Sequence, residues 1–278
     1  MATTNLGLSQ PAQGTLDWHS LLNTNFGLVD DGVTRAPLFG LTLSNNATDA
    51  TNDIDIAAGA AVARSGSLPL TLASALTKQL DATWAAGTNQ GGRASSQALA
   101  NGTWHVHLIR VAGATDIGFD TSATAANLIA DHGATHYRRI GSILRESLAI
   151  VGFVQNGDKF MRKTYPIDVN ATDPGIAAVT RTLSVPTGIK VEAIFSAYAD
   201  SPTANAYWLF TDLDETDQAP SGSLLMLASD TAVRSGIGTF RVWTNTNGQI
   251  RSRTSGSDAN TLLRIMTHGW IDQRGKDA

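Results

Sequence analysis

The chain has 278 residues with a formal net charge of −4, no cysteine and 16% charged residues, where soluble domains usually have about 25%. The lack of cysteine excludes disulfides, thiolate zinc sites and cysteine nucleophiles, and the charge shows no basic bias toward nucleic acid. No apolar run approaches the roughly 20 residues of a membrane-spanning helix, and the N-terminus lacks the pattern of a signal peptide, so we expect no membrane insertion.

Residues 1–35 form the first predicted segment, which contains one short helix. Asp17 is placed to cap it, and Gly32 is a stop signal. Four apolar residues recur between them at helical spacing: Trp18, Leu22, Phe26 and Val29. We call these four residues the apolar stripe. Because an isolated helix of this length is marginal in water, the stripe is expected to dock on the next domain or on a neighbouring chain.

Residues 36–165 alternate short apolar runs with turn residues, a pattern that predicts a β-sandwich domain. The predicted strands are Phe39–Leu43, Ile54–Val62, Trp104–Val111, Thr115–Phe119, Thr135–Leu144 and Ala149–Gln155. The sequences NQGG (89–92) and QNGD (155–158) predict turns. Ser67–Trp84 fits either a long strand or a short helix, and Asn127–Asp131 predicts one helical turn.

Residues 166–278 predict a second, C-terminal β-sandwich of jelly-roll type, because strands recur about every ten residues. The predicted strands are Lys190–Ala199, Tyr207–Asp212, Leu224–Ala228, Thr239–Thr244, Gln249–Thr254 and Thr261–Thr267. TNTNGQ (244–249) and SGSDAN (255–260) predict hairpins. The expected fold is therefore mainly β, with a short N-terminal helix followed by two antiparallel β-sandwich or jelly-roll-like domains.

The sequence GTWHVHLIRV (102–111) places His105 and His107 on one face of a strand. Two imidazoles on one face can supply half of a metal site, but such a site needs a third ligand. His132 and His136 lie in a loop that could pass nearby. The alternative is that both rings fill a packing surface. With no third ligand identified, we predict no metal and no cofactor.

The loop TDLDETD (211–217) carries four carboxylates, which could suit a calcium ion: Asp212, Asp214, Glu215 and Asp217. The spacing fails the EF-hand pattern, because positions six and twelve hold Asp217 and Ser223. A solvated acidic loop and an irregular cation site therefore both stay open. The chain has no G-x-S-x-G, H-E-x-x-H, Walker A or dinucleotide-binding motif, so we predict no enzyme activity and assign no catalytic residue.

Several stretches together resemble tail-fibre and tail-associated virion proteins of tailed bacteriophages. They are NLGLSQPAQGTLDWHSLLNTNFGLVDD (5–31), LDATWAAGTNQGGRASSQALANGTWHVHLI (80–109), IGFDTSATAANL (117–128), THYRRIGSIL (135–144), FVQNGDKFMRK (153–163) and LLRIMTHGWIDQRGKD (262–277). The order of these stretches along the chain carries the resemblance. Position 107 is commonly aromatic in the similar strands, which favours the space-filling interpretation of His107.

The resemblance implies a non-enzymatic structural protein of the virion, assembled in the bacterial host cytoplasm. A tail fibre or receptor-binding component acting in host adhesion and particle assembly is expected. Its partners would be two further copies of the chain in a homotrimer, other phage tail or capsid proteins, and a host surface glycan or receptor. Trp18, Leu22, Phe26 and Val29 would anchor or trimerise it. The alternatives are a capsid-attached head fibre or decoration protein and a virion-borne glycan depolymerase.

Overall fold

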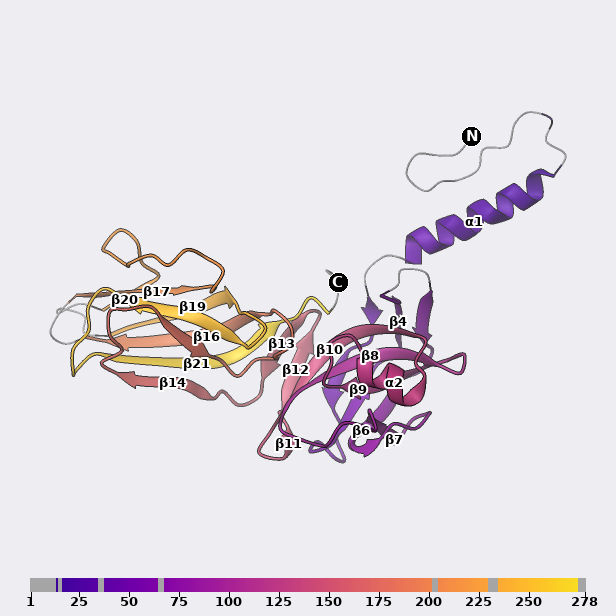
Figure 1. The fold of residues 1–278 in the computed structure, drawn as a ribbon, viewed down its shortest axis with the longest axis horizontal. Coiled ribbons are helices and arrows are strands. Elements are labelled where there is room, and N and C mark those ends of the chain that lie inside the picture. The colour runs from indigo at the N-terminus through magenta and orange to yellow at the C-terminus, as the bar shows by residue number, and fades with distance from the viewer. Residues whose placement is uncertain are drawn as a thin grey trace.

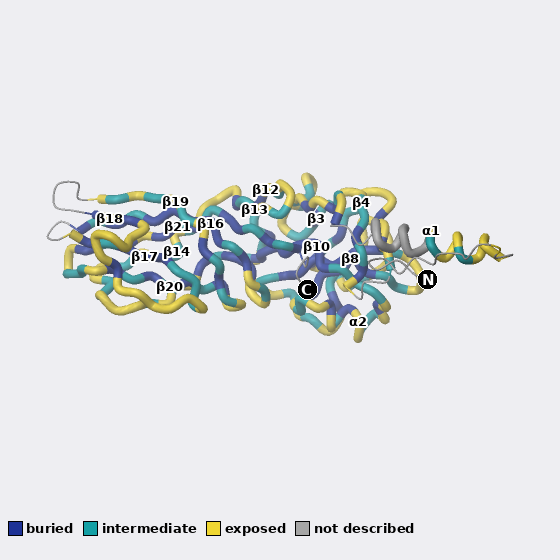
Figure 2. Tube along the Cα trace, turned by 90° about the horizontal axis from the view of Figure 1, so that it is seen from above, coloured by how far each residue is buried: buried dark blue, intermediate teal, exposed yellow. Residues whose placement is uncertain are grey.

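A computed structural model describes residues 14, 17–34, 38–64, 68–201, 205–229 and 235–274, without the side chains of residues 27–34. The protein is mainly β, with 51% of its residues in strands, several antiparallel sheets and a short N-terminal helix. Helix α1 (Trp18–Thr34) projects from one end of an elongated β body (Figure 1). Buried residues run along the length of that body (Figure 2).

The N-terminal half is built around an eight-stranded sheet of order β11-β10-β8-β9-β7-β6-β3-β2. Its strands are β2 (Leu43–Asn45), β3 (Asp53–Ile56), β6 (Leu76–Thr83), β7 (Gln90–Arg93), β8 (Gly102–Val111), β9 (Ala114–Asp120), β10 (His136–Glu146) and β11 (Ala149–Ile150). β7 runs parallel to both β6 and β9. The sheet is therefore mixed, which departs from the antiparallel sandwich expected for residues 36–165.

This mixed sheet is nearly closed, like a barrel. Side-chain amides connect its β2 edge to the segment that follows β11. The amide N–H of Leu43 donates to Gln155 Oε1 at 2.7 Å, and that of Phe153 donates to Asn45 Oδ1 at 3.0 Å. These bonds satisfy edge groups that would otherwise be free to pair with another strand.

Two smaller elements cover the mixed sheet. Strands β1 (Phe39–Gly40), β4 (Gly59–Val62) and β5 (Pro69–Leu72) form a three-stranded sheet. Helix α2 (Ala126–His132) packs on β9, where Asp120 accepts hydrogen bonds from the amides of Asn127 and Leu128. A Cβ at Gly118 would lie 2.7 Å from the Leu128 side chain, so a glycine is needed for this close packing.

The C-terminal half contains two antiparallel sheets. The six-stranded sheet consists of β12 (Phe153–Asn156), β13 (Lys159–Arg162), β14 (Ile167–Thr172), β16 (Glu192–Asp200), β19 (Ser235–Trp243) and β21 (Leu262–Ile271). The four-stranded sheet consists of β15 (Val179–Thr182), β17 (Ala206–Thr211), β18 (Leu227–Ser229) and β20 (Gln249–Thr254). Rings of the two sheets meet between them, with the Phe195 and Phe210 centroids 5.6 Å apart.

The predicted central strands of the mixed sheet are confirmed, because β8, β9 and β10 each agree within two residues at both ends. The turn predicted at 155–158 is also found, as a tight connection between β12 and β13. Three predicted strands are wrong, because each is divided between two strands that belong to different sheets. Phe39–Leu43 is divided between β1 and β2, Ile54–Val62 between β3 and β4, and Ala149–Gln155 between β11 and β12.

Both predicted C-terminal hairpins are wrong. The loops at 244–249 and 255–260 connect strands of different sheets, β19 to β20 and β20 to β21. The turn predicted at 89–92 lies largely within strand β7. A Cβ at Gly91 would be 2.0 Å from the Thr83 carbonyl oxygen, and one at Gly92 would be 2.8 Å from the Phe119 ring. These glycines permit close approach of a strand rather than a reversal of the chain.

Of the Ser67–Trp84 alternatives, the described part (68–84) forms strands, β5 and β6, rather than a helix, and Ser67 lies outside the described residues. The helical turn predicted at 127–131 is confirmed as part of α2. Helix α1 continues to Thr34, two residues beyond the stop signal at Gly32.

The two halves of the β body share one hydrophobic core. Phe160 of β13 stacks on Trp270 of β21, with centroids 5.6 Å apart and planes inclined by 4°. Beside them, Arg139 of β10 makes two hydrogen bonds to Asp272, at 2.6 and 2.7 Å, in an ion pair whose side chains are 9% and 1% exposed. The junction therefore contains a stacked aromatic pair and a buried, bidentate ion pair.

The substitution Asp272→Asn should lower the free energy of unfolding by about 3 kcal/mol, because it leaves the Arg139 guanidinium buried without a counter-charge. Urea unfolding at pH 7 measures the loss. The matched control is Asp214→Asn, which breaks the ion pair to Lys190, whose side chains are 69% and 49% exposed. That change should cost far less than Asp272→Asn, because solvent screens an exposed ion pair. Equal losses in the two variants would contradict the importance of the junction pair.

Candidate functional site

His105 and His107 lie side by side on β8, fully buried, with ring centroids 6.4 Å apart. The Nδ1 atom of His105 is 2.9 Å from Ser142 Oγ, and Ser142 Oγ also accepts a hydrogen bond from Arg139. The His107 Nε2–H donates to the Ser122 carbonyl at 3.0 Å. Each ring thus connects β8 to a neighbouring segment by one hydrogen bond, and its other nitrogen has no partner among the described residues.

The other two candidate histidines lie elsewhere. His132 ends α2 and contacts the Trp84 ring, while His136 Nδ1 is 3.1 Å from the Thr135 hydroxyl. Within the described ranges, no group of three or more His, Asp or Glu side chains is arranged to hold a metal ion. The arrangement therefore fits hydrogen-bonded rings inside a core.

Burial keeps both rings neutral. Burial, with a smaller contribution from the nearby Arg139 guanidinium, lowers the pKa of His105 and of His107 from 6.5 to about 3. A neutral imidazole is the form that a core excluding water favours. At physiological pH the pair therefore adds no charge to its surroundings.

The ring signals of His105 and His107 should not titrate between pH 5 and 8 in an NMR experiment. The unfolded chain takes up the two protons near pH 6.5, whereas the folded chain takes them up only near pH 3. The contribution of the neutral rings to stability is therefore complete above pH 6.5 and is lost as the pH falls toward 3. Between pH 6.5 and pH 3, the free energy of unfolding should fall by up to roughly 2.7 kcal/mol for each unit by which the pH is lowered. His107→Gln should remove about half of this slope. Titration midpoints near 6.5 for both rings would contradict the assignment.

Arginines of β20 hold the acidic loop at 211–217. Arg251 donates hydrogen bonds to the carbonyl oxygens of Asp212, Leu213 and Glu215. Arg253 pairs with Asp217 at 2.7 Å, and Asp214 pairs with Lys190. Two of the four carboxylates, Asp214 and Asp217, are thus paired with cationic side chains, and three backbone carbonyl oxygens of the loop are bound by Arg251, which favours the solvated-loop interpretation.

A second acidic cluster, not singled out by the sequence, surrounds Asp53 of β3. Burial, together with the carboxylates of Asp49, Asp81 and Asp55, raises the pKa of Asp53 to about 6. The charged form is therefore disfavoured in the folded protein above pH 6, and this cost disappears below pH 3.8, where Asp53 is protonated in both states.

The substitution Asp53→Asn should raise the free energy of unfolding by about 1 kcal/mol at pH 7, after solvent screening, and should leave it unchanged near pH 3.5. Thermal unfolding at the two pH values measures the difference. The contrasting control is Asp131→Asn, since Asp131 accepts a 2.7 Å hydrogen bond from the Ser96 amide that lowers its pKa. That variant should lose stability at pH 7. A loss of stability in Asp53→Asn at pH 7 would refute the assignment.

The apolar stripe lies on α1, as its spacing predicts, and its described side chains are exposed. Trp18, Leu22 and Phe26 expose 56%, 37% and 61% of their surface. Val29 belongs to the helix, but its side chain lies outside the described residues. Phe39, which begins β1 shortly after the helix, is 77% exposed. Exposed apolar side chains that share one helix face form a candidate interaction surface.

Comparison with protein-family models and with curated proteins finds no match to this chain. Neither helix in the described ranges is long and apolar enough to cross a membrane.

Proposed function

We propose that this chain is a non-enzymatic structural protein of a tailed-bacteriophage particle, a tail-fibre or receptor-binding component that acts in assembly and host adhesion. The observation that carries the proposal is the exposed apolar stripe on a helix projecting from an elongated β body (Figure 1). A water-soluble chain gains stability when such a surface is covered. The order of the six resembling stretches supports the assignment to phage virion proteins.

The occupant proposed for the stripe is the same surface of two further copies of the chain. Helices marked by apolar residues three and four positions apart can bury one another's stripes along a common axis. A 17-residue helix cannot bury its own stripe and gains little stability alone. The proposed assembly is a homotrimer with the helices at its centre and the β bodies directed outward.

The β body suits the display of loops to a host surface. Its C-terminal sheets, joined by loops that cross from one sheet to the other, support a sandwich of jelly-roll type, which we propose as the finer fold of that half. The loops gather at the ends of such a sandwich, where a rigid scaffold positions them.

Immunoelectron microscopy of particles produced by the genome that encodes this chain tests the proposed location. Antibody against the chain should label the tail. Label on the capsid would replace the tail assignment by the head-fibre alternative, and particles without label would refute a virion role. Release of reducing sugars from host polysaccharide by the purified chain would refute the non-enzymatic assignment.

The double substitution Trp18→Ala and Phe26→Ala should convert the trimer to single chains of 29.2 kDa while the β body stays folded. The reason is that two aromatic side chains, each worth about 2 kcal/mol or more when buried, would be lost from every helix. Size-exclusion chromatography with light scattering measures the mass, and circular dichroism checks the fold.

The matched control replaces two equally exposed apolar residues of the β body, Leu148 and Ile176, which are 68% and 61% exposed. This control should leave the mass of a trimer unchanged. A wild-type chain that elutes as a monomer, or a trimer that persists in the Trp18 and Phe26 double variant, would contradict the proposed role of the stripe.

A further inference from the structure

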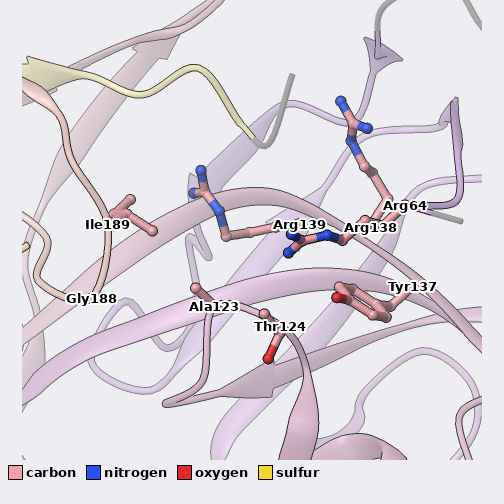
Figure 3. Close-up of a pocket in the computed structure, with 8 residues that line it drawn as sticks. All are labelled: Arg64, Ala123, Thr124, Tyr137, Arg138, Arg139, Gly188 and Ile189. Atoms are coloured by element: carbon pink, nitrogen blue, oxygen red, sulfur yellow. The ribbon is translucent and has the colours of Figure 1, made fainter. Parts of the chain in front are cut away.

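A pocket of about 280 Å³ lies where the mixed sheet meets the C-terminal half. Three arginines line it, together with two hydroxyl-bearing side chains, an apolar wall and a glycine (Figure 3): Arg64, Arg138, Arg139, Tyr137, Thr124, Ala123, Ile189 and Gly188. Its residues come from four segments far apart in the sequence. Concave sites at the junction of two structural units are frequent places for ligands.

The positive charge around this pocket is only partly neutralised. Arg139 is paired with Asp272, and the neighbouring Arg274 is paired with Asp158 at 2.8 Å. Arg64 and Arg138 have no carboxylate partner among the described residues. Within the described ranges, two guanidinium charges therefore have no counter-charge, in a chain whose overall charge is −4.

Arg138 carries the clearest sign of an absent partner. Its Nε atom is buried without a hydrogen bond in the described structure. Burial, followed by the charges of Arg139, Arg274 and Arg64, lowers the pKa of Arg138 below its ordinary value. The side chain as a whole is half-buried, but a buried donor without an acceptor costs about 1–3 kcal/mol, so an acceptor at Nε would be favourable.

The surrounding backbone holds these groups in place. The chain of β10 is irregular between Arg139 and Gly141, where its register with β8 shifts, and such bulges redirect side chains next to binding sites. The Arg64 amide donates to the Tyr137 carbonyl at 2.8 Å. Opposite them, Gly188 has a φ of +82° and lies so close to His105 that a Cβ would be 3.1 Å from its Nε2.

The His105 Nε2 atom adds a second, independent feature. His105 is fully buried, and this nitrogen has no hydrogen-bond partner among the described residues. It faces Gly188, which lines the pocket. A polar atom of a buried side chain thus faces the pocket wall on the side opposite Arg64 and Arg138.

We propose that this pocket binds an oxyanion group, a carboxylate or a phosphate, carried by a small molecule or a sugar residue. The planar guanidinium group presents paired N–H donors that match the oxygens of either anion. The hydroxyl groups of Tyr137 and Thr124 can hydrogen-bond the polar remainder of the ligand, and Ala123 and Ile189 can contact its apolar part. The proposal rests on the arginines and on the neighbouring His105 Nε2 atom, so it is independent of the virion role proposed above.

Isothermal titration at constant ionic strength tests the site with three probes: inorganic phosphate, galacturonate and neutral galactose. At least one of the two anions should bind saturably, and galactose should not. If phosphate binds and galacturonate does not, the pocket is a phosphate site. If galacturonate binds and phosphate does not, it is a carboxylate site. Failure of both anions to bind beyond the effect of sodium chloride would overturn the proposal.

The substitution Arg138→Gln should weaken binding of the anion about tenfold, the effect of losing a charge-assisted hydrogen bond. The matched control is Arg181→Gln. Arg181 is also half-buried, its pKa is lowered by burial, and it donates to the Ser252 hydroxyl rather than to a carboxylate. Wild-type affinity in Arg138→Gln, or equal weakening in both variants, would overturn the proposal.

Stability separates a binding role from a structural one. Without ligand, Arg138→Gln should unfold at the same temperature as the wild type or a higher one, because it removes a desolvated charge. If this variant fails to fold, Arg64→Gln decides, since Arg64 is exposed and its loss should still weaken anion binding at least about threefold. Unchanged affinity in Arg64→Gln would then overturn the proposal.

Discussion

The ion pair between Arg139 and Asp272 is the contact on which the arrangement of the two halves depends. Asp272 follows β21 directly, and β21 pairs with β13, β14 and β16, so the pair ties the backbone of the six-stranded sheet to β10 of the mixed sheet. Burying two charges is costly unless every oxygen is hydrogen-bonded. Asp272 meets this condition, since it accepts two bonds from Arg139 and one from the Arg274 amide.

The same arginine adds to the burial that keeps the histidine pair neutral. Arg139 also donates to Ser142, which contacts His105, and its charge disfavours protonation of both rings. A fully buried His-x-His strand beside a fixed guanidinium therefore behaves as neutral, polar packing. The metal interpretation of His105 and His107 would require a third ligand, which neither His132 nor His136 supplies, because those residues lie against other segments.

Local sequence patterns predict several central strands well, but they do not predict which strands pair. β8, β9 and β10 follow from runs of apolar residues, which depend only on neighbouring positions. Sheet membership depends on distant contacts. The loop at 244–249 has ideal hairpin residues, yet β19 pairs with β16 and β20 pairs with β15 and β17. Likewise, the glycines at 91 and 92 predict a turn, but the structure uses them where Thr83 and Phe119 lie too close for a Cβ atom. No pattern within either segment carries that information.

The apolar stripe and the arginine pocket also differ in whether the sequence predicts them. The apolar stripe is readable from spacing alone, because a helix brings its residues onto one face without help from other segments. The arginine pocket cannot be predicted from spacing, because Arg138 and Arg139 are adjacent in the sequence and yet only Arg139 has a carboxylate partner among the described residues. Asp272, which lies near the C-terminal end of the described residues, neutralises Arg139. Arg138 instead lies near the positive charges of Arg139, Arg274 and Arg64. Within the described residues, Arg139 has a carboxylate partner and Arg138 beside it has none, and the proposed anion would supply the counter-charge that Arg138 lacks there.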